Sequence, residues 1–232
     1  KEPPRGCFES SSAKTVSATR FAEALRILLS RKTFVQLVIA YSLGLFASYG
    51  LGQWLPTFFV RIHNMSLTKV GFWLGLTLGT GSVFGTALGG FAARRLIEKD
   101  RRWEIWFVLV SYAVCIPIYA LVFIVPNANA ALALTFLGGL AASLGIGPGM
   151  AAVQTVIEAN LRATAIAIIM FFSALLGQGG GPLVIGILSD LLSPVYGENS
   201  LRVALLFSLL ILGWSLIHFH LAAKSIREEI VA

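Results

Sequence analysis

The sequence predicts an all-α integral membrane protein whose six transmembrane helices form a 3+3 inverted-repeat bundle. Three observations predict this fold. Hydrophobic residues make up 56% of the 232-residue chain and charged residues only 12%, with a mean hydropathy of +0.81, whereas soluble domains carry about twice that share of charge. Six apolar stretches are each long enough to cross a bilayer core, which takes about 20 residues of helix. The basic residues, finally, separate onto two sides of these stretches.

The six apolar stretches follow one another with short polar loops between them. Residues 1–32 are expected to form a cytoplasmic linker that ends in an amphipathic helix over 19–31, and residues 223–232 a cytoplasmic tail. Between them, residues 33–222 form the membrane domain. Each triplet of spans has a glycine-rich middle helix, which is the pattern of inverted-repeat membrane proteins. The expected spans are 33–60, 69–93, 103–125, 130–157, 164–188 and 201–222.

The distribution of charge predicts the orientation in the membrane. All 18 Lys and Arg residues except Arg61, Lys69 and Arg202 fall on the side that holds both termini. Cytoplasmic loops of membrane proteins are enriched in these residues. We therefore expect both termini to be cytoplasmic, in a plasma or inner membrane or in that of an organelle. The net charge of +7 follows from this topology, and no nucleic-acid partner is expected.

Glycine and proline interrupt most of the spans. In the second span two glycine rows have four-residue spacing, 71–75–79 and 81–85–89, and each row allows a neighbouring backbone to approach closely. The alternative is that such positions are hinges. Breaks are expected at residues 145–149 of the fourth span and 179–182 of the fifth, because proline frees a backbone carbonyl. The positions expected to act in packing or as hinges are Gly85, Gly89, Pro148, Gly177, Gly181 and Pro182.

One stretch resembles a known family. It runs from Leu161-Arg162-Ala163-Thr164-Ala165 through Gly181-Pro182 and Ile185-Gly186 to Ser189-Asp190. This pattern resembles the eleventh helix of spinster-like transporters of the major facilitator superfamily, and Gly52-x-Trp54-x-Pro56 resembles their seventh. The loop after the second span departs from the superfamily pattern, since Ala92-Ala93-Arg94-Arg95 lacks the usual aspartate. A gating contact by that aspartate is therefore not carried over.

The resemblance implies the C-terminal half of a twelve-helix carrier that works by alternating access. It implies an amphiphilic, lipid-like small-molecule substrate such as a lysophospholipid or a sphingoid phosphate, and it implies proton coupling. The implied partners are the lipid bilayer and an N-terminal half of six helices, which in this family usually carries the proton-binding acid. A carrier of another small organic solute is the alternative, as is a scaffold or channel subunit that does not transport.

By the same resemblance, the first and fourth spans line the central cavity. A cavity for an amphiphile is mostly apolar with a few polar groups, and interhelical hydrogen bonding is an equally good interpretation of each polar residue. The candidates for the cavity are Tyr41, Ser48, Tyr49, Gln53 and Gln154.

Charged residues near the span ends are candidates for a gate or for coupling. Glu158 and Arg162 lie four residues apart at the end of the fourth span, so they form either a local ion pair or a gate. Asp190 lies at the outer end of the fifth span, where it either caps a turn or closes an outer gate.

Other classes of protein are less consistent with the sequence. An intramembrane enzyme needs a nucleophile with a base, paired carboxylates or metal ligands within the spans, and no such motif occurs. A channel is expected to have rings of charged residues lining its pore, and the sequence shows none. We therefore expect no enzymatic activity, no cofactor and no bound metal.

Overall fold

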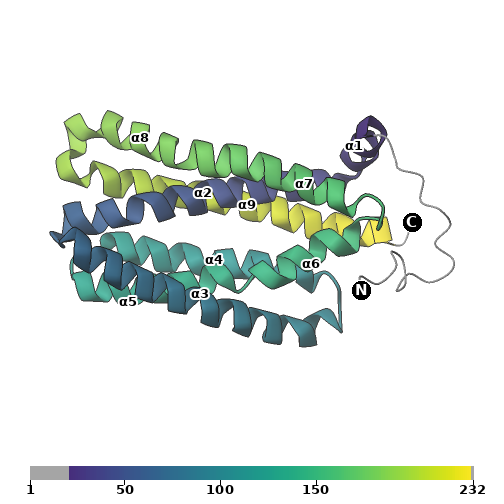
Figure 1. The fold of residues 1–232 in the computed structure, drawn as a ribbon, viewed down its shortest axis with the longest axis horizontal. Helices are drawn as coiled ribbons and strands as arrows, with labels where there is room; N and C mark the ends of the chain where they lie inside the picture. Colours follow the sequence, from purple (N-terminus) through teal and green to yellow (C-terminus); the bar gives the residue numbers. More distant parts are fainter. Residues whose placement is uncertain (1–20, 231–232) are drawn as a thin grey trace, which may run out of the picture.

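The computed structural model describes residues 21–230, with side chains to residue 226. The linker predicted for residues 1–20 lies outside the described residues. All the regular elements of the described part are helices, which confirms the all-α membrane fold (Figure 1). Its elements are α1 (Phe21–Ser30), α2 (Lys32–His63), α3 (Leu67–Ile97), α4 (Trp103–Ile124), α5 (Ala128–Ser143), α6 (Ile146–Val156), α7 (Arg162–Phe172), the π-helix η1 (Ser173–Gly180), α8 (Gly181–Tyr196), the short 3-10 helix η2 (Gly197–Asn199) and α9 (Ser200–Ile230).

Five stretches of the described chain are long and apolar enough to cross a membrane. The last of them, Arg162–Ile226, has 65 residues, or about 100 Å of helix, which is far more than one crossing needs. It folds back at Gly197, whose φ of 54° suits glycine, so that α8 and α9 lie side by side (Figure 1). The described residues therefore form six antiparallel crossings. The repeat symmetry of the two triplets stays a prediction.

The helices begin where the sequence predicts, but the last two extend further. The fifth crossing runs to Tyr196 and α9 runs to Ile230, beyond the expected ends at residues 188 and 222. No Gly or Pro follows residue 222, and Lys, Arg and Glu are good helix formers. The residues predicted as a tail are therefore helical as far as Ile230.

The two predicted helix breaks have different outcomes. The fourth crossing does break, at Leu144 and Gly145 between α5 and α6, so that Pro148 falls inside the first turn of α6. The fifth crossing stays helical. Instead of a break it contains η1, in which residues 173–180 are wound as a π-helix, and Pro182 follows in the first turn of α8. The predicted interruption at residues 179–182 is wrong, because the chain there continues as helix and the irregular winding lies before it, in the π-helical residues 173–180.

The short helix α1 lies across one end of the bundle, which we call the α1 end (Figure 1). Its apolar face buries Ala24 and Leu28 against α2 and α7. The α3–α4 loop, the α6–α7 turn and the end of α9 lie at the same end. This end gathers most of the basic residues that the structure describes, whereas Arg61, Lys69 and Arg202 lie at the opposite end. The two-sided charge distribution of the sequence is thus retained in the fold.

The core has two parts along the length of the bundle. At the α1 end, Leu28 and Phe34 pack with Ile105, Ile157 and Phe219. The other part brings together residues of α2, α4 and α9, among them Phe58, Phe59, Phe123, Leu201 and Leu205. The most extensive helix contacts are those of α2 with α9 and with η1, of α3 with α5, and of α4 with both α5 and α9. Helix α2 thus lies at the centre, between α3 and α8.

The two glycine rows of α3 have different surroundings. A Cβ on Gly85 or Gly89 would overlap the main-chain carbonyl of Leu140 or Leu144, so this row holds α3 directly against α5. A Cβ on any residue of the row 71–75–79 would meet nothing within 4 Å among the described residues. A similar close contact joins α2 to α8, because a Cβ on Gly181 would overlap the carbonyl oxygen of Phe46. On Gly177 it would lie 3.1 Å from Leu45.

Candidate functional site

An exposed stripe of small and polar residues runs along the middle of α2. Ser48 and Tyr49 are half-buried, while Gly52 and Gln53 are exposed. They lie halfway along a helix of 32 residues, and hence near the middle of the membrane. Exposed polar groups at that depth face water or protein rather than lipid, because hydrocarbon offers no hydrogen-bond partner. The stripe therefore marks a face that is turned away from lipid.

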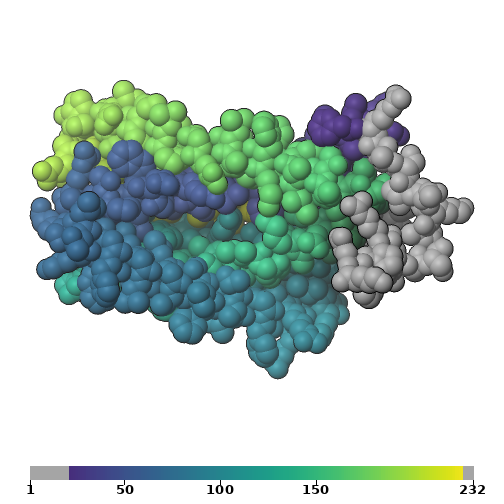
Figure 2. Space-filling view, in the orientation of Figure 1, coloured from purple at the N-terminus to yellow at the C-terminus, as the bar shows by residue number. Residues whose placement is uncertain are grey.

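An apolar pocket of about 400 Å³ lies on one flank of this stripe, between α2, α3, α4 and α5. Figure 2 shows a hollow between α2 and α3 near the middle of the molecule. Ser48, Gly52 and Ser82 lie among apolar side chains there. The volume falls within the usual range of ligand sites. The rest of the lining consists of Leu51, Leu55, Leu78, Gly79, Cys115, Tyr119, Gly139, Ala142, Ser143 and Leu212.

A second, open pocket of about 440 Å³ lies on the other flank, between α2 and the η1–α8 region. Polar and apolar atoms contribute about equally to its lining, and we call it the polar pocket because of its two glutamines. It is lined by Gln53, Trp54, Thr57, Gln178 and Pro182. The amide nitrogen Nε2 of Gln178 donates a hydrogen bond of 2.9 Å to the hydroxyl of Tyr49. The indole N–H of Trp54 donates one of 2.8 Å to the carbonyl oxygen of Pro182. These two bonds tie α2 to the π-helix and to the start of α8.

Gln178 is a site residue that the sequence did not reveal. It lies in η1, and π-helical segments occur frequently at functional sites. Helical spacing places a residue on a face only when the winding is regular. Over residues 173–180 the winding changes, so the face on which Gln178 lies does not follow from the α-helical period.

Two of the predicted cavity residues lie elsewhere. Tyr41 is buried in the core at the α1 end, where its ring meets Phe219 edge to face at 5.2 Å between centroids. It lines neither pocket, and its hydroxyl has no hydrogen-bond partner among the described residues. Gln154 is exposed on α6, also outside both pockets. The residues that the structure does bring together are Ser48, Tyr49 and Gln53.

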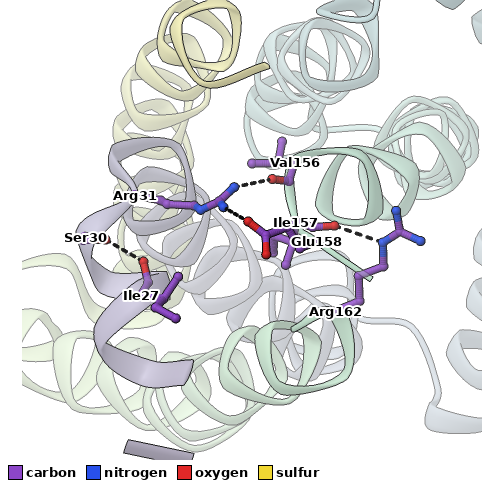
Figure 3. Close-up of polar contacts among 7 residues, drawn as sticks. All are labelled: Ile27, Ser30, Arg31, Val156, Ile157, Glu158 and Arg162. Carbon is purple, nitrogen blue, oxygen red and sulfur yellow. Dashed lines mark hydrogen bonds and ion pairs between the residues drawn. The ribbon is translucent and has the colours of Figure 1, made fainter. Parts of the chain in front are cut away.

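The gate candidates Glu158 and Arg162 do not pair with each other. Instead, Arg31 reaches from the α1–α2 junction and places its Nη2 2.5 Å from a carboxylate oxygen of Glu158 (Figure 3). Arg31 also donates to the carbonyl oxygen of Val156 at 3.2 Å. Arg162 donates to the carbonyl oxygen of Ile157 at 3.0 Å. The predicted local ion pair is therefore wrong.

The reason lies in the end of α6. Val156 is its last residue and Ile157 is extended, so both carbonyls lack helical partners. Two arginines satisfy them, and a cation is also favoured by the negative end of the helix dipole. Arg31 is 125 residues distant from Val156 in sequence, so no local spacing indicates this contact. We call the contacts of Arg31 with Val156 and Glu158 the Arg31 bridge.

Replacing Arg31 with alanine is expected to loosen α1 from the α6–α7 turn. The side chains of the ion pair are 25% and 59% exposed, so the loss is modest, about 1 kcal/mol. Amide exchange in residues 21–30 is then expected to become about fivefold faster. Hydrogen exchange followed by mass spectrometry measures this. Arg26→Ala is the control, since Arg26 is exposed on the same helix. Equal exchange in both variants contradicts a holding role for the Arg31 bridge.

Asp190 lies in a polar pocket of about 420 Å³ at the opposite end of the bundle. Arg61 and Glu198 lie in the same pocket, together with Asn64 and Ser193. None of the three charged residues forms an ion pair within the described part of the chain. Asp190 is thus near a cation and an anion but bound to neither.

Glu104 is a buried acid that the sequence analysis did not single out. It lies in the first turn of α4 and is only 5% exposed. The hydroxyl of Thr155 donates to its Oε1 at 3.2 Å, and its Oε2 has no partner among the described residues. An acid in the first turn complements the helix dipole, which offsets part of the cost of burying this carboxylate.

The chain is similar to known transporters. The sequence model of the family described as the Major Facilitator Superfamily matches residues 1–182 of this chain. An "MFS-type efflux pump" of Mycolicibacterium smegmatis is 33% identical over 88% of this chain and 48% of that protein. The sphingosine-1-phosphate transporter of Danio rerio is 24% identical over 86% of this chain and 42% of that protein. The chain thus spans less than half the length of these relatives.

A solved structure matches the fold. It is a bacterial homologue of the human lysosomal transporter spinster, in an inward-facing and unoccupied conformation. The TM-score is 0.80 at 21% identity, and the match covers 99% of this chain and 55% of that one.

Proposed function

This chain belongs to the Major Facilitator Superfamily and is of the spinster type. From this premise we propose that it forms the C-terminal half of a carrier for an amphiphilic solute. The carrier works by alternating access and takes up lipid-like molecules such as a lysophospholipid or a sphingoid phosphate. The name of the Danio rerio relative supports this substrate class.

The observation that carries the proposal is the exposed polar stripe on α2 with a pocket on each flank. One pocket is lined mainly by leucine and glycine, and the other by glutamine, threonine and tryptophan. An amphiphile needs both environments, because its tail avoids polar groups and its head requires hydrogen bonds. Both pockets lie halfway along the spans, where carriers of this architecture bind their solutes.

The exposed stripe also supports a second half. Large apolar side chains cover the exposed faces of α8 and α9, among them Leu183, Leu191, Leu210 and Trp214, which suits contact with lipid. The face with Tyr49, Gln53 and Gln178 is polar and does not suit lipid. An N-terminal half of six helices would cover it, and the cavity would lie between the two halves.

Orientation and coupling are part of the proposal. The basic α1 end would face the cytoplasm, which places both termini there. Transport would be coupled to protons through an acid of the other half. Glu158 and Arg162 would act at the cytoplasmic gate. Glu158 would do so through the Arg31 bridge, and Arg162 through its hydrogen bond to the carbonyl oxygen of Ile157. Asp190 would act at the outer gate, beside Arg61 and Glu198.

The test is uptake by the full-length protein in liposomes. With a proton gradient imposed, labelled oleoyl-lysophosphatidylcholine is expected to enter at a rate that saturates with concentration and falls when the gradient is collapsed. Residues 1–232 alone should give no such uptake, because half of the cavity would be missing. Flux that never saturates would indicate a channel, and its complete absence a scaffold, and either result contradicts the proposal.

A second candidate is a carrier of another small organic solute. It is favoured by the relative of 33% identity, which is named an efflux pump. In the same liposomes, this candidate predicts saturable flux of a non-lipid solute that an excess of lysophospholipid does not inhibit.

A further inference from the structure

The two pockets lie on opposite flanks of the same short segment of α2. Successive residues of an α-helix are about 100° apart. Ser48, Leu51 and Leu55 therefore share one flank, and all three line the apolar pocket. Gln53 and Thr57 share the other flank and line the polar pocket. The helix, about 10 Å wide, lies between the two.

Gly52 lies on the ridge between these flanks. It is exposed, and a Cβ at this position would meet nothing within 4 Å. It also lines the apolar pocket. Because Gly52 has no side chain, the surface of α2 is low at this point, and we call this low point the saddle. A flexible molecule can pass across it from one pocket to the other.

We propose that one amphiphile lies across α2 at Gly52, with its tail in the apolar pocket. The segment next to its headgroup is uncharged and carries a hydroxyl. Tyr49, Gln53 and Gln178 form hydrogen bonds with this hydroxyl. This inference rests on the proposed function and adds to it the chemical group that this half recognises. A glycerol or sphingoid backbone with its free hydroxyl is such a segment.

The apolar pocket suits the tail by composition. Its lining includes Leu51, Leu55, Leu78 and Leu212, and its polar groups are small hydroxyls and one thiol besides Tyr119. None of the described residues that line this pocket or the polar one is charged. A charged headgroup therefore finds no counter-ion on this side of the cavity, and leaving it unpaired here is costly.

The polar side suits a hydroxyl. Gln178 uses its Nε2 to donate to the oxygen of Tyr49. The O–H of Tyr49 is then able to donate, and the Oε1 of Gln178 to accept, and neither group bonds to another described residue. A ligand hydroxyl both donates and accepts, so it completes this arrangement. The amide of Gln53, exposed on the neighbouring turn of α2, provides a further donor and acceptor.

The first test probes the hydroxyl in the full-length protein. Binding of 1-oleoyl-lysophosphatidylcholine is compared with that of its 2-deoxy analogue, which has the same tail and the same charges. The wild type is expected to bind the analogue about fivefold more weakly, as for the loss of one hydrogen bond. In Gln178→Leu this difference is expected to become clearly smaller, because the contact with Gln178 is lost while Tyr49 and Gln53 still bond the hydroxyl. A purely structural role would weaken both ligands equally and would overturn the inference.

The second test fills the saddle. Gly52→Leu is expected to reduce uptake of 1-oleoyl-lysophosphatidylcholine more than tenfold, since the ligand is blocked from crossing the ridge. Gly213→Leu is the control, because Gly213 also has nothing within 4 Å of its Cβ and lines neither pocket. If the two variants take up the ligand equally, the inference is overturned. Uptake by the wild type in the same experiment would still support the proposed function. If the wild type takes up no amphiphile, the proposed function fails and the inference fails with it.

Discussion

Replacing Gly89 with valine is expected to abolish the accumulation of folded protein. A Cβ at this position would overlap the carbonyl oxygen and carbon of Leu144. These are main-chain atoms at the break between α5 and α6, so no rotation of a side chain relieves the overlap. Helix α3 would have to move away from α5, which is its main neighbour.

The size of this effect follows from how lightly α3 is held. It is the least buried of the candidate spans. In a bilayer, close van der Waals packing rather than expulsion of water holds helices together. An insertion into a packed contact typically destabilises by about 1–3 kcal/mol and occasionally by more. Here the clash removes the contact that keeps α3 in place, so we expect the upper end of the range or beyond.

The matched control for this prediction is the next residue. A Cβ on Gly90 would meet nothing within 4 Å, so Gly90→Val introduces the same β-branched side chain into the same helix without the overlap. Size-exclusion chromatography of the detergent-solubilised protein measures the folded fraction, and a thermal-shift assay measures its stability. If Gly90→Val lowers both as much as Gly89→Val does, helix propensity rather than the contact with α5 is responsible.

Replacing Phe219 with alanine is expected to destabilise the α1 end by about 3 kcal/mol. Phe219 is fully buried on α9. Its ring meets Tyr41 at 5.2 Å and Tyr112 at 5.9 Å between centroids, both edge to face. Alanine leaves a cavity among these rings and removes both aromatic contacts.

Phe207→Ala is the control for the cavity. Phe207 lies on the same helix but is 46% exposed, so its ring contacts lipid in both the folded and the unfolded chain. Lipid is as apolar as phenylalanine, and the change there is expected to be nearly neutral. Thermal unfolding in lipid nanodiscs gives the comparison. Equal losses for the two variants would mean that burial in lipid, rather than packing within the bundle, sets the stability of this region.

Much of the fold was predictable because a segment that crosses the hydrocarbon of a bilayer must be apolar and must satisfy its own backbone hydrogen bonds. Length and hydropathy located all six crossings, and the basic residues that the structure describes lie at the two ends as predicted. The predicted breaks were less accurate. A glycine–proline sequence shows where winding is weak, but it does not distinguish a turn, as at Gly145, from the π-helix of residues 173–180.

The site was less predictable, since both lipid and protein interior are apolar. Tyr41 and Ser48 are seven residues apart and therefore share a helix face, yet along that face Tyr41 meets Phe219 and Ser48 lines a pocket. The same limit applies to the glycine rows, of which only 81–85–89 faces α5. The contacts of Glu158 with Arg31 and of Gln178 with Tyr49 join residues more than 120 positions apart. Such contacts depend on the packing of whole helices.

The Arg31 bridge has a mechanical consequence. It fastens the first residues of α2 to the last residue of α6 and to Glu158 just beyond it. The first and fourth crossings therefore share an anchor at this end, and no ion pair among the described residues joins them at the other. A motion that separates these two crossings at the α1 end must therefore break the Arg31 bridge, whereas a motion that keeps it intact moves the two ends together.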